Sequence, residues 1–223
     1  MAQNYGNVLP RSDLALLFDP ANPKCYPGSG TTIYDMSGHN NNGTIAGSMV
    51  FTNPYMTFDG TDDQITVTAN QDSLNFRFEQ TLILWMYHTF TSGRRNPWDQ
   101  AYGGYGTWTH EQGNNINNYY GNAGSNTTPY SSRGSTSTPT STWQMMSITR
   151  NPSTVTWYRN GTSSNSASNA YGVLAQTTAN IRIGNGYAGR WIGNMGMVMA
   201  YKRALTATEI DTIYQRTRGV YGV

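Results

Sequence analysis

The sequence predicts an all-β fold with one helix near its C-terminal end. Hydrophobic residues make up 37% of the chain and charged residues only 12%, so uncharged polar side chains and 24 glycines must cover much of the surface. That composition is typical of turn-rich β structure and differs from that of a helical bundle. Short apolar runs between polar turns indicate strands, and only one segment repeats its apolar residues with a helical period.

The length of the chain fits one domain. A β-sandwich of 223 residues can remain a single folding unit, so we expect one domain over residues 1–223. In this prediction residues 1–12 form a polar lead, and residues 205–217 supply the helix and the tail.

Strong turn signals divide the first part of the chain. Residues 14–18 are apolar and are followed by Pro20, so they form the first predicted strand. Residues 32–34 lead into the polar segment 35–43, in which Gly and Asn can adopt positive φ angles. We therefore expect a hairpin-like loop at 35–43.

The next strands predict a packed core. Residues 56–59 and 64–68 flank a turn at 60–63, and the second of these strands alternates apolar with polar residues, which indicates one buried face. Residues 81–87 are apolar on both faces, as expected of the central strand of a sandwich.

Hairpin signals continue in the second half of the chain. Residues 144–149 and 154–158 form a predicted hairpin, and Asn160-Gly161 marks a tight turn after it. The last predicted strands cover residues 181–184 and 193–201.

The predicted helix begins near Leu205. Thr206 and Glu209 have the spacing of a capping box, and Leu205 can pack against Ile210 as a hydrophobic staple. The apolar residues that follow recur on one face, so the helix should pack on the sandwich and end near Gly219.

Charge and apolar run lengths exclude several partners. The net charge is +2, and twelve arginines and two lysines are spread along the chain, so no concentrated basic face for nucleic acid is expected. The longest apolar run, 82–87, is too short for membrane insertion. Cys25 is the single cysteine, which excludes an intramolecular disulfide. Because the N-terminal residues lack the pattern of a signal peptide, we expect a protein made soluble in the cytoplasm.

Four segments carry patterns of a known domain family. Residues 35–43 read D-x-S-G-x-x-N-x-G, residues 58–63 read F-D-G-x-D-D, and residues 143–161 read W…R…Y-x-N-G. The ending, at residues 201–210, reads Y-x-R-x-L-T-x-x-E-I. Together they resemble the laminin-G type domains of the concanavalin A-like lectin/glucanase superfamily, and the resemblance runs across nearly the whole chain. It implies a concanavalin A-like jelly-roll β-sandwich of two antiparallel sheets with one short C-terminal helix.

Two further segments suggest where such a domain would work. Residues 99–108 and 118–121 resemble versions of the domain that occur in viral structural genes, as in phage structural proteins. The resemblance implies a non-enzymatic virion structural or decoration protein of a capsid, tail or fibre. Its expected partners are other virion proteins and copies of itself, and its expected location is the virion.

Catalytic patterns are missing from the sequence. A glycosidase on this scaffold needs two nearby carboxylates, yet the chain has only Glu79, Glu111 and Glu209, and the last belongs to the helix cap. Cys25 and the three histidines lie far apart in unrelated segments, so neither a nucleophile triad nor a zinc site is indicated. We therefore expect no catalytic residues and no enzyme activity.

An acidic turn is the one candidate metal site. Asp59, Asp62 and Asp63 place three carboxylates in one turn, and calcium prefers such oxygen ligands. The alternative is that these carboxylates accept hydrogen bonds from their own backbone amides. The predicted cofactor is thus none, with calcium as the ion to be tested.

Aromatic residues mark the candidate binding surface. Rings of Trp and Tyr can stack on sugars, and the same residues are enriched in protein interfaces. The alternative for each ring is a place in the sandwich core. The candidates are Trp98, Tyr102, Tyr105, Trp108, Tyr119, Tyr120 and Tyr130.

These observations leave two hypotheses for function. One is the virion structural or decoration protein, docking through aromatic and arginine-bearing loops. The other is a glycan-binding, lectin-like module that binds cell-surface polysaccharide, with or without help from calcium.

Overall fold

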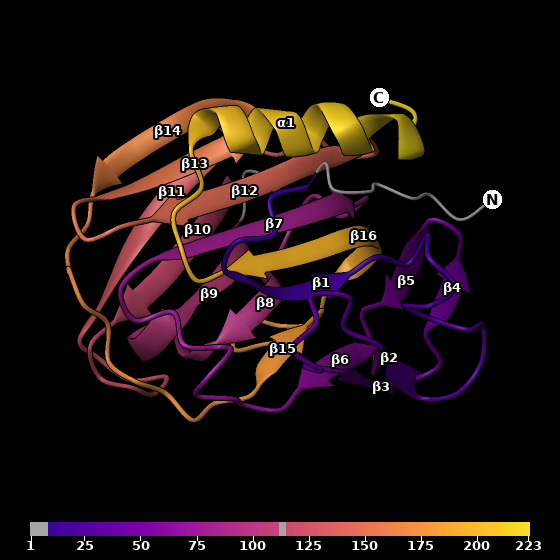
Figure 1. Cartoon of the computed structure of the whole chain (residues 1–223), viewed down its shortest axis with the longest axis horizontal. Helices are drawn as coiled ribbons and strands as arrows, with labels where there is room; N and C mark the ends of the chain where they lie inside the picture. Colours follow the sequence, from indigo (N-terminus) through magenta and orange to yellow (C-terminus); the bar gives the residue numbers. More distant parts are fainter. Residues whose placement is uncertain (1–8, 112–114) are drawn as a thin grey trace.

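The computed structural model describes residues 9–111 and 115–223, except the side chains of residues 133, 135 and 136. Within these residues the strands form two antiparallel sheets of eight strands each, packed face to face (Figure 1). The predicted sandwich of two antiparallel sheets with a short C-terminal helix is thereby confirmed. The first eight residues of the predicted lead lie outside the described residues.

The first sheet carries the C-terminal helix on its outer face. Its strands are β1 (Leu14–Phe18), β4 (Val50–Thr52), β5 (Tyr55–Asp59), β7 (Gln80–Tyr87), β12 (Gln144–Arg150), β13 (Thr154–Arg159), β14 (Thr162–Ser168) and β16 (Ile192–Tyr201). They lie in the order β14-β13-β12-β7-β16-β5-β4, and β1 pairs with β16 beside that path.

The second sheet forms the other layer. Its strands are β2 (Thr32–Ile33), β3 (Gly43–Ala46), β6 (Gln64–Val67), β8 (Arg95–Gln100), β9 (Gly106–Glu111), β10 (Asn115–Gly121), β11 (Tyr130–Ser137) and β15 (Ile181–Ile183). Their order is β11-β10-β9-β8-β15-β6-β3-β2. A short π-type turn, η2 (Ala101–Tyr105), joins β8 to β9.

The predicted central strand is confirmed as β7. It lies between β12 and β16, and its residues alternate between two buried environments. Leu82, Leu84 and Met86 point into the core between the sheets, whereas Ile83 and Trp85 belong to an apolar cluster beneath the helix. Because full burial of such side chains contributes roughly 1.5–3 kcal/mol each, β7 stabilises both the core between the sheets and the packing of the helix on the first sheet.

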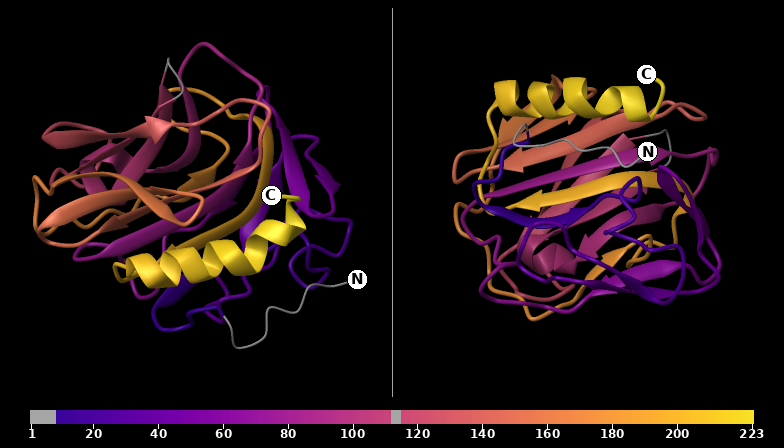
Figure 2. Two further views of the ribbon diagram at one scale, coloured as in Figure 1. Left: turned by 90° about the horizontal axis from the view of Figure 1, so that it is seen from above. Right: turned by 45° about the vertical axis from the view of Figure 1, so that its right-hand side comes forward.

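The helix α1 (Ala207–Thr217) lies along the outside of the sandwich, away from the space between the sheets (Figure 2). Its predicted capping box is confirmed, because the Glu209 amide donates to Thr206 Oγ1 at 3.2 Å and the Thr206 amide donates to Glu209 Oε2 at 2.9 Å. Leu205 and Ile210 are both buried in the cluster beneath the helix, which confirms the staple.

A 3₁₀ turn lies between the helix and the last three residues. This turn, η3 (Arg218–Val220), follows α1 directly. Among the described residues, no helix has both the length and the apolar character needed to cross a membrane.

The predicted hairpins are confirmed. β2 pairs with β3 and β12 pairs with β13, and Asn160 and Gly161 have positive φ angles of 50° and 82° in the turn to β14. The strands on either side of the turn at 60–63 belong to different sheets, however, because β5 pairs with β16 and β6 pairs with β15. This turn carries the chain from one layer to the other.

Candidate ligand-binding site

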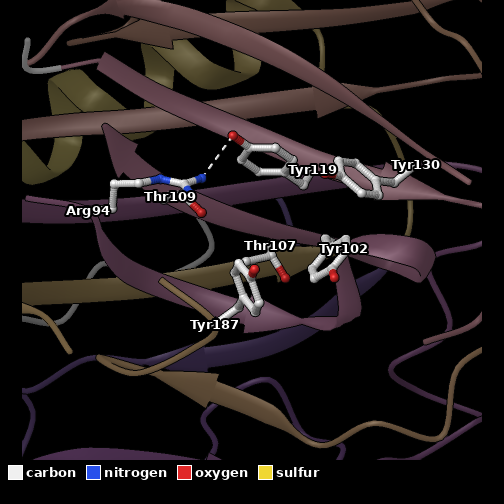
Figure 3. A pocket seen from close by; sticks show the side chains of 7 residues that line it. All are labelled: Arg94, Tyr102, Thr107, Thr109, Tyr119, Tyr130 and Tyr187. Atoms are coloured by element: carbon white, nitrogen blue, oxygen red, sulfur yellow. Dashed lines mark hydrogen bonds between the residues drawn. The ribbon is translucent and has the colours of Figure 1, made fainter. Parts of the chain in front are cut away.

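A small cavity of about 170 Å³ lies on the second sheet (Figure 3). We call it the tyrosine cup. It is lined by Arg94, Tyr102, Thr107, Thr109, Tyr119, Tyr130 and Tyr187.

Strand alternation places the cup on the outer face of the second sheet. Trp108 on β9 and Tyr120 on β10 are packed in the core between the sheets. Neighbouring residues on a strand point to opposite faces, so Thr107, Thr109 and Tyr119 point away from that core. In the β9–β10 register Thr107 lies opposite Tyr119, which brings both to the same part of the face.

The turn η2 brings Tyr102 to the cup. Ala101 adopts a positive φ of 68°, which lifts the chain out of the regular strand between β8 and β9. The Tyr102 amide then donates to Asn126 Oδ1 at 3.1 Å. At Gly103 an added Cβ would overlap the backbone carbonyls of Ser125 and Thr127, so the turn needs glycine to approach that loop.

Four tyrosine rings form an aromatic cluster with Tyr102 at its centre. The ring centroid of Tyr102 lies 4.7 Å from that of Tyr130, 5.4 Å from that of Tyr187 and 6.4 Å from that of Tyr119. The interplanar angles are 78°, 64° and 72°, so the contacts are edge to face, the arrangement that aromatic pairs prefer. Tyr187 is 68% exposed and Tyr130 is 39% exposed, which leaves large aromatic surfaces open to solvent.

An ion pair closes one end of the cup. Arg94 Nε donates to Glu111 Oε2 at 2.7 Å, and Arg94 Nη2 donates to Glu111 Oε1 at 2.9 Å. The Tyr119 hydroxyl donates to Glu111 Oε1 at 3.0 Å and accepts from Arg94 Nη2 at 3.0 Å. The hydrogen bond to Glu111 raises the pKa of Arg94, and burial followed by the hydrogen bond to Glu111 raises the pKa of Tyr119. The guanidinium therefore stays charged and the phenol stays neutral near neutral pH.

A buried carboxylate lies beneath the floor of the cup. Thr107 Oγ1 donates to Asp99 Oδ1 at 2.6 Å, and Arg182 Nη1 lies 4.0 Å from Asp99 Oδ2. Burial raises the pKa of Asp99, against the opposing effects of Thr107 and Arg182. Beside it, Thr109 Oγ1 accepts from Asn96 Nδ2 at 3.1 Å.

The structure separates the predicted aromatic residues into two groups. Tyr102, Tyr119 and Tyr130 come together in the cup. The other four have the alternative place, in the sandwich core, because they pack between the sheets and their exposed fraction is 0%. These four are Trp98, Tyr105, Trp108 and Tyr120.

Sequence reasoning missed several residues of the cup. Tyr187 comes from the loop after β15, and Arg94 precedes β8, so neither belongs to the aromatic-rich stretch that contains the predicted residues, 98–130. Thr107 and Thr109 gave no signal, because threonine is common in the chain. The alternation Thr107-Trp108-Thr109 is the one sequence feature from which an outward-facing threonine pair could be inferred.

The acidic turn brings its three carboxylates together. Asp59, Asp62 and Asp63 have ligand oxygens within 4.8 Å of one another. The predicted alternative also holds in part, since Asp59 Oδ1 accepts from the Thr61 amide at 2.7 Å and Asp63 Oδ2 accepts from the Asp59 amide at 3.0 Å. Asp63 Oδ1 is buried without a hydrogen-bond partner among the described residues, and burial raises the pKa of Asp63. An oxygen of this kind fits a hard cation such as calcium.

Two of the histidines lie together, contrary to the expectation that all three lie apart. The rings of His88 and His110 have centroids 4.5 Å apart, and both pack against Phe90 and Trp191. His110 Nε2 is 3.0 Å from Thr138 Oγ1. The folding of the 88–95 segment over β9 brings these distant residues into contact and also places Arg94 near Glu111.

Burial lowers the pKa of both histidines. It lowers the pKa of His88, and with a further contribution from His88 it lowers the pKa of His110 to about 3. Both rings are therefore neutral at ordinary pH, and protonating either one favours opening of this part of the fold.

Structural comparison finds the same fold in toxin binding domains. The receptor-binding domain of botulinum neurotoxin C/D mosaic serotype has a TM-score of 0.72 at 14% identity, and the binding domain of Paraclostridial Mosquitocidal Protein 1 has 0.72 at 16%. The binding domain of botulinum neurotoxin DC, solved in complex with SialylT, has 0.69 at 13%. Each match covers 92% of this chain and 52% of the other, so this chain spans about half the length of those structures. At such identities the likeness shows a shared fold.

Comparison by sequence places the chain in a family. The curated proteins gave no match. A laminin-G family model, described as the concanavalin A-like lectin/glucanases superfamily, matches residues 59–211. This range runs from the end of β5 into α1 and includes every residue that lines the cup. Since the match covers more than half of the sequence, the chain belongs to the concanavalin A-like lectin/glucanases superfamily.

Proposed function

We propose that the chain is a non-catalytic carbohydrate-binding module and that the tyrosine cup is its binding site. The observation that carries this proposal is the cluster of four tyrosines around a cavity with hydroxyl groups on its floor. Ligand sites combine apolar or aromatic walls with a few placed polar groups, and the cup has both. A sugar ring has the matching character, with an apolar face and hydroxyls around its edge.

The size of the cup supports a small ligand unit. Its volume of about 170 Å³ is below the roughly 300–1,000 Å³ of pockets for drug-sized ligands. One sugar residue at the end or side of a longer chain fits that scale. The exposed rings of Tyr130 and Tyr187 would then contact neighbouring units of the chain.

The arrangement of carboxylates supports binding without hydrolysis. A retaining glycosidase holds two carboxyl groups roughly 5–5.5 Å apart, one on each side of the bond to be cleaved. None of the described residues that line the cup is an acid, and the nearby Glu111 accepts two hydrogen bonds from Arg94. Glu111 is thus held as an ion-pair partner and not as a proton donor.

The structural neighbours support a role in recognition. One of them is a toxin binding domain solved in complex with SialylT. That complex concerns a protein twice the length matched here, so it supports the class of function and not the position of the site.

A place on a virion remains a second candidate. The segments that resemble viral structural proteins, residues 99–108 and 118–121, are those that supply Tyr102, Thr107 and Tyr119 to the cup. A virion protein could use the cup to hold cell-surface polysaccharide or to dock on another virion protein. Mass spectrometry of purified particles from the source tests this candidate, and absence of the chain from the particles contradicts it.

Glycan-array binding tests the main proposal. We expect the wild-type chain to bind saccharides, and we expect Tyr187→Ala to reduce the signal at least tenfold. The matched control is Tyr34→Ala, because Tyr34 is also an exposed tyrosine, at 45%, but does not line the cup. Absence of any saccharide binding, or equal binding by the Tyr187 variant, contradicts the proposal.

A further inference from the structure

The charges at the tyrosine cup cancel in pairs. Arg94 is the one charged side chain among the described residues that line the cup. Both of its hydrogen-bonded nitrogens face Glu111, in the two-pronged geometry that gives the strongest contact between arginine and a carboxylate. The guanidinium is therefore already neutralised by a partner of opposite charge.

Beneath the floor there is a second compensated pair. Asp99 is only 3% exposed and lies 4.0 Å from Arg182, whose side chain is 50% exposed. An acidic ligand in the cup would face Glu111 at one end and Asp99 below. An anion could reach Arg94 only at Nη1, and the charge of this guanidinium is already compensated by Glu111. The cup therefore offers an acidic ligand no unpaired cation to offset the loss of its hydration.

The hydrogen-bonding groups that remain are of mixed type. The Thr107 hydroxyl already donates its hydrogen to Asp99, so Thr107 Oγ1 can only accept a hydrogen bond from a ligand. Thr109 Oγ1 accepts from Asn96, which leaves its hydrogen to donate. Arg94 Nη1 has no hydrogen bond within the described residues and can also donate. A sugar hydroxyl both donates and accepts, so neighbouring hydroxyls can satisfy this set.

We infer that the cup selects an uncharged sugar unit, a neutral hexose, pentose or N-acetylhexosamine, over sialic and uronic acids. This inference rests on the proposed function, because it names the class of saccharide that the same site takes. It also separates this chain from the toxin binding domain that was solved with SialylT.

A matched glycan array tests the inference. The probes are lactose and sialyllactose on the same linker, together with glucose and glucuronic acid on the same linker. We expect the wild-type chain to bind the neutral member of at least one pair at least tenfold more tightly than its acidic partner. We also expect binding to change less than twofold between 50 and 500 mM NaCl, because no net charge is neutralised on binding.

A charge variant provides a second arm of the test. Glu111→Gln removes the compensating charge while keeping the size of the side chain, and it leaves Arg94 as an unpaired cation beside the cup. We expect this variant to shift the ratio of acidic to neutral binding upward by at least fivefold. The Tyr34→Ala chain should keep the wild-type ratio.

The outcomes separate the inference from the proposed function. If the wild type prefers the acidic probes and Tyr187→Ala abolishes that binding, the cup binds sugars but the inference of neutral selectivity is overturned. If the wild type binds no saccharide at all, both the inference and the proposed function are overturned. If Glu111→Gln fails to fold, the wild-type probe pairs and their salt dependence still decide the matter.

Discussion

Tyr102 and Tyr187 meet edge to face with ring centroids 5.4 Å apart, although one comes from the turn η2 and the other from the loop after β15. This contact holds the turn after β8 against the loop after β15, and these two strands are neighbours in the second sheet. It fixes one wall of the tyrosine cup before any ligand arrives, and a site that is already ordered loses less entropy on binding.

The ring of Tyr187, and not its hydroxyl, should carry its contribution to binding. Tyr187→Phe keeps the ring, so we expect sugar affinity within threefold of wild type, whereas Tyr187→Ala should weaken binding at least tenfold. Because Tyr187 is 68% exposed, the free energy of unfolding of both variants should lie within about 0.5 kcal/mol of the wild-type value. Titration calorimetry with the best glycan from the array and urea unfolding measure the two effects. Equal loss in both variants would show that the hydroxyl is the important group.

Truncation of a core tryptophan should lower the stability of the fold. Trp108 is fully buried and packs 5.8 Å from Trp157 across the core, measured between ring centroids. We expect Trp108→Ala to lower the free energy of unfolding by about 3–5 kcal/mol, as for other large core residues. Chemical denaturation measures this change. A loss below about 1 kcal/mol would contradict the placement of Trp108 in the core.

The close approach of η2 to the loop at 125–127 should depend on Gly103. An added Cβ at Gly103 overlaps two carbonyl groups, so Gly103→Ala should displace Tyr102 and weaken sugar binding together with thermal stability. Gly219→Ala is the control, since nothing lies within 4 Å of a Cβ there. Melting curves and calorimetry of both variants make the comparison. Wild-type behaviour of Gly103→Ala would mean that the turn has another conformation.

The buried histidine pair should make the fold sensitive to acid. The pKa of His110 is about 3 in the folded chain, and an unfolded histidine titrates near 6.5. The unfolded chain therefore binds more protons between these values, and the contribution of His110 to stability is fully present above pH 6.5 and is lost as the pH falls. The expected slope is up to roughly 1.4 kcal/mol per pH unit for such a group.

Variants isolate this effect from that of buried carboxylates. Burial raises the pKa of Asp19 to about 6, which changes stability in the opposite direction as the pH falls. His110→Phe removes only the histidine, so the difference in melting temperature between wild type and variant should change between pH 7 and pH 4. His39→Gln alters an exposed histidine and should leave the wild-type pH dependence unchanged. Parallel pH profiles for wild type and His110→Phe would contradict the account.

Calcium should stabilise the acidic turn if Asp63 Oδ1 is a ligand. We expect 1–5 mM CaCl₂, which equals or exceeds the roughly 0.1–1 mM dissociation constant of a weak extracellular-type site, to raise the melting temperature of the wild type. Asp63→Asn should lose most of that increase, whereas Asp72→Asn, which changes an exposed acid outside the turn, should keep it. If calcium does not raise the melting temperature of the wild type, the calcium site is contradicted, and the carboxylates act only as hydrogen-bond acceptors within the turn.

Local signals predicted most of the fold. The capping box at Thr206 and Glu209, the apolar strand β7 and the turn at Asn160-Gly161 depend on residues close together in sequence, and each was confirmed. The assignment of strands to sheets was harder. The turn at 60–63 connects strands of different sheets, and nothing within those residues distinguishes such a crossing from a hairpin.

The cup could be predicted only in part, because it depends on which face each strand turns outward. Along residues 98–120 aromatic rings occur on both faces, so the usual contrast between apolar and polar positions is lost. Composition indicated Tyr102 and Tyr119, and it indicated Trp108 equally, although Trp108 lies in the core. Tyr187 joins the site only through the tertiary fold.

A crystal structure of the chain with its best array glycan would locate the bound sugar. We expect a sugar ring in the cup, in contact with Tyr102 and Tyr187 and hydrogen-bonded to Thr107 or Thr109. Sugar density on another face, with the cup left to solvent, would contradict the assignment of the tyrosine cup as the binding site.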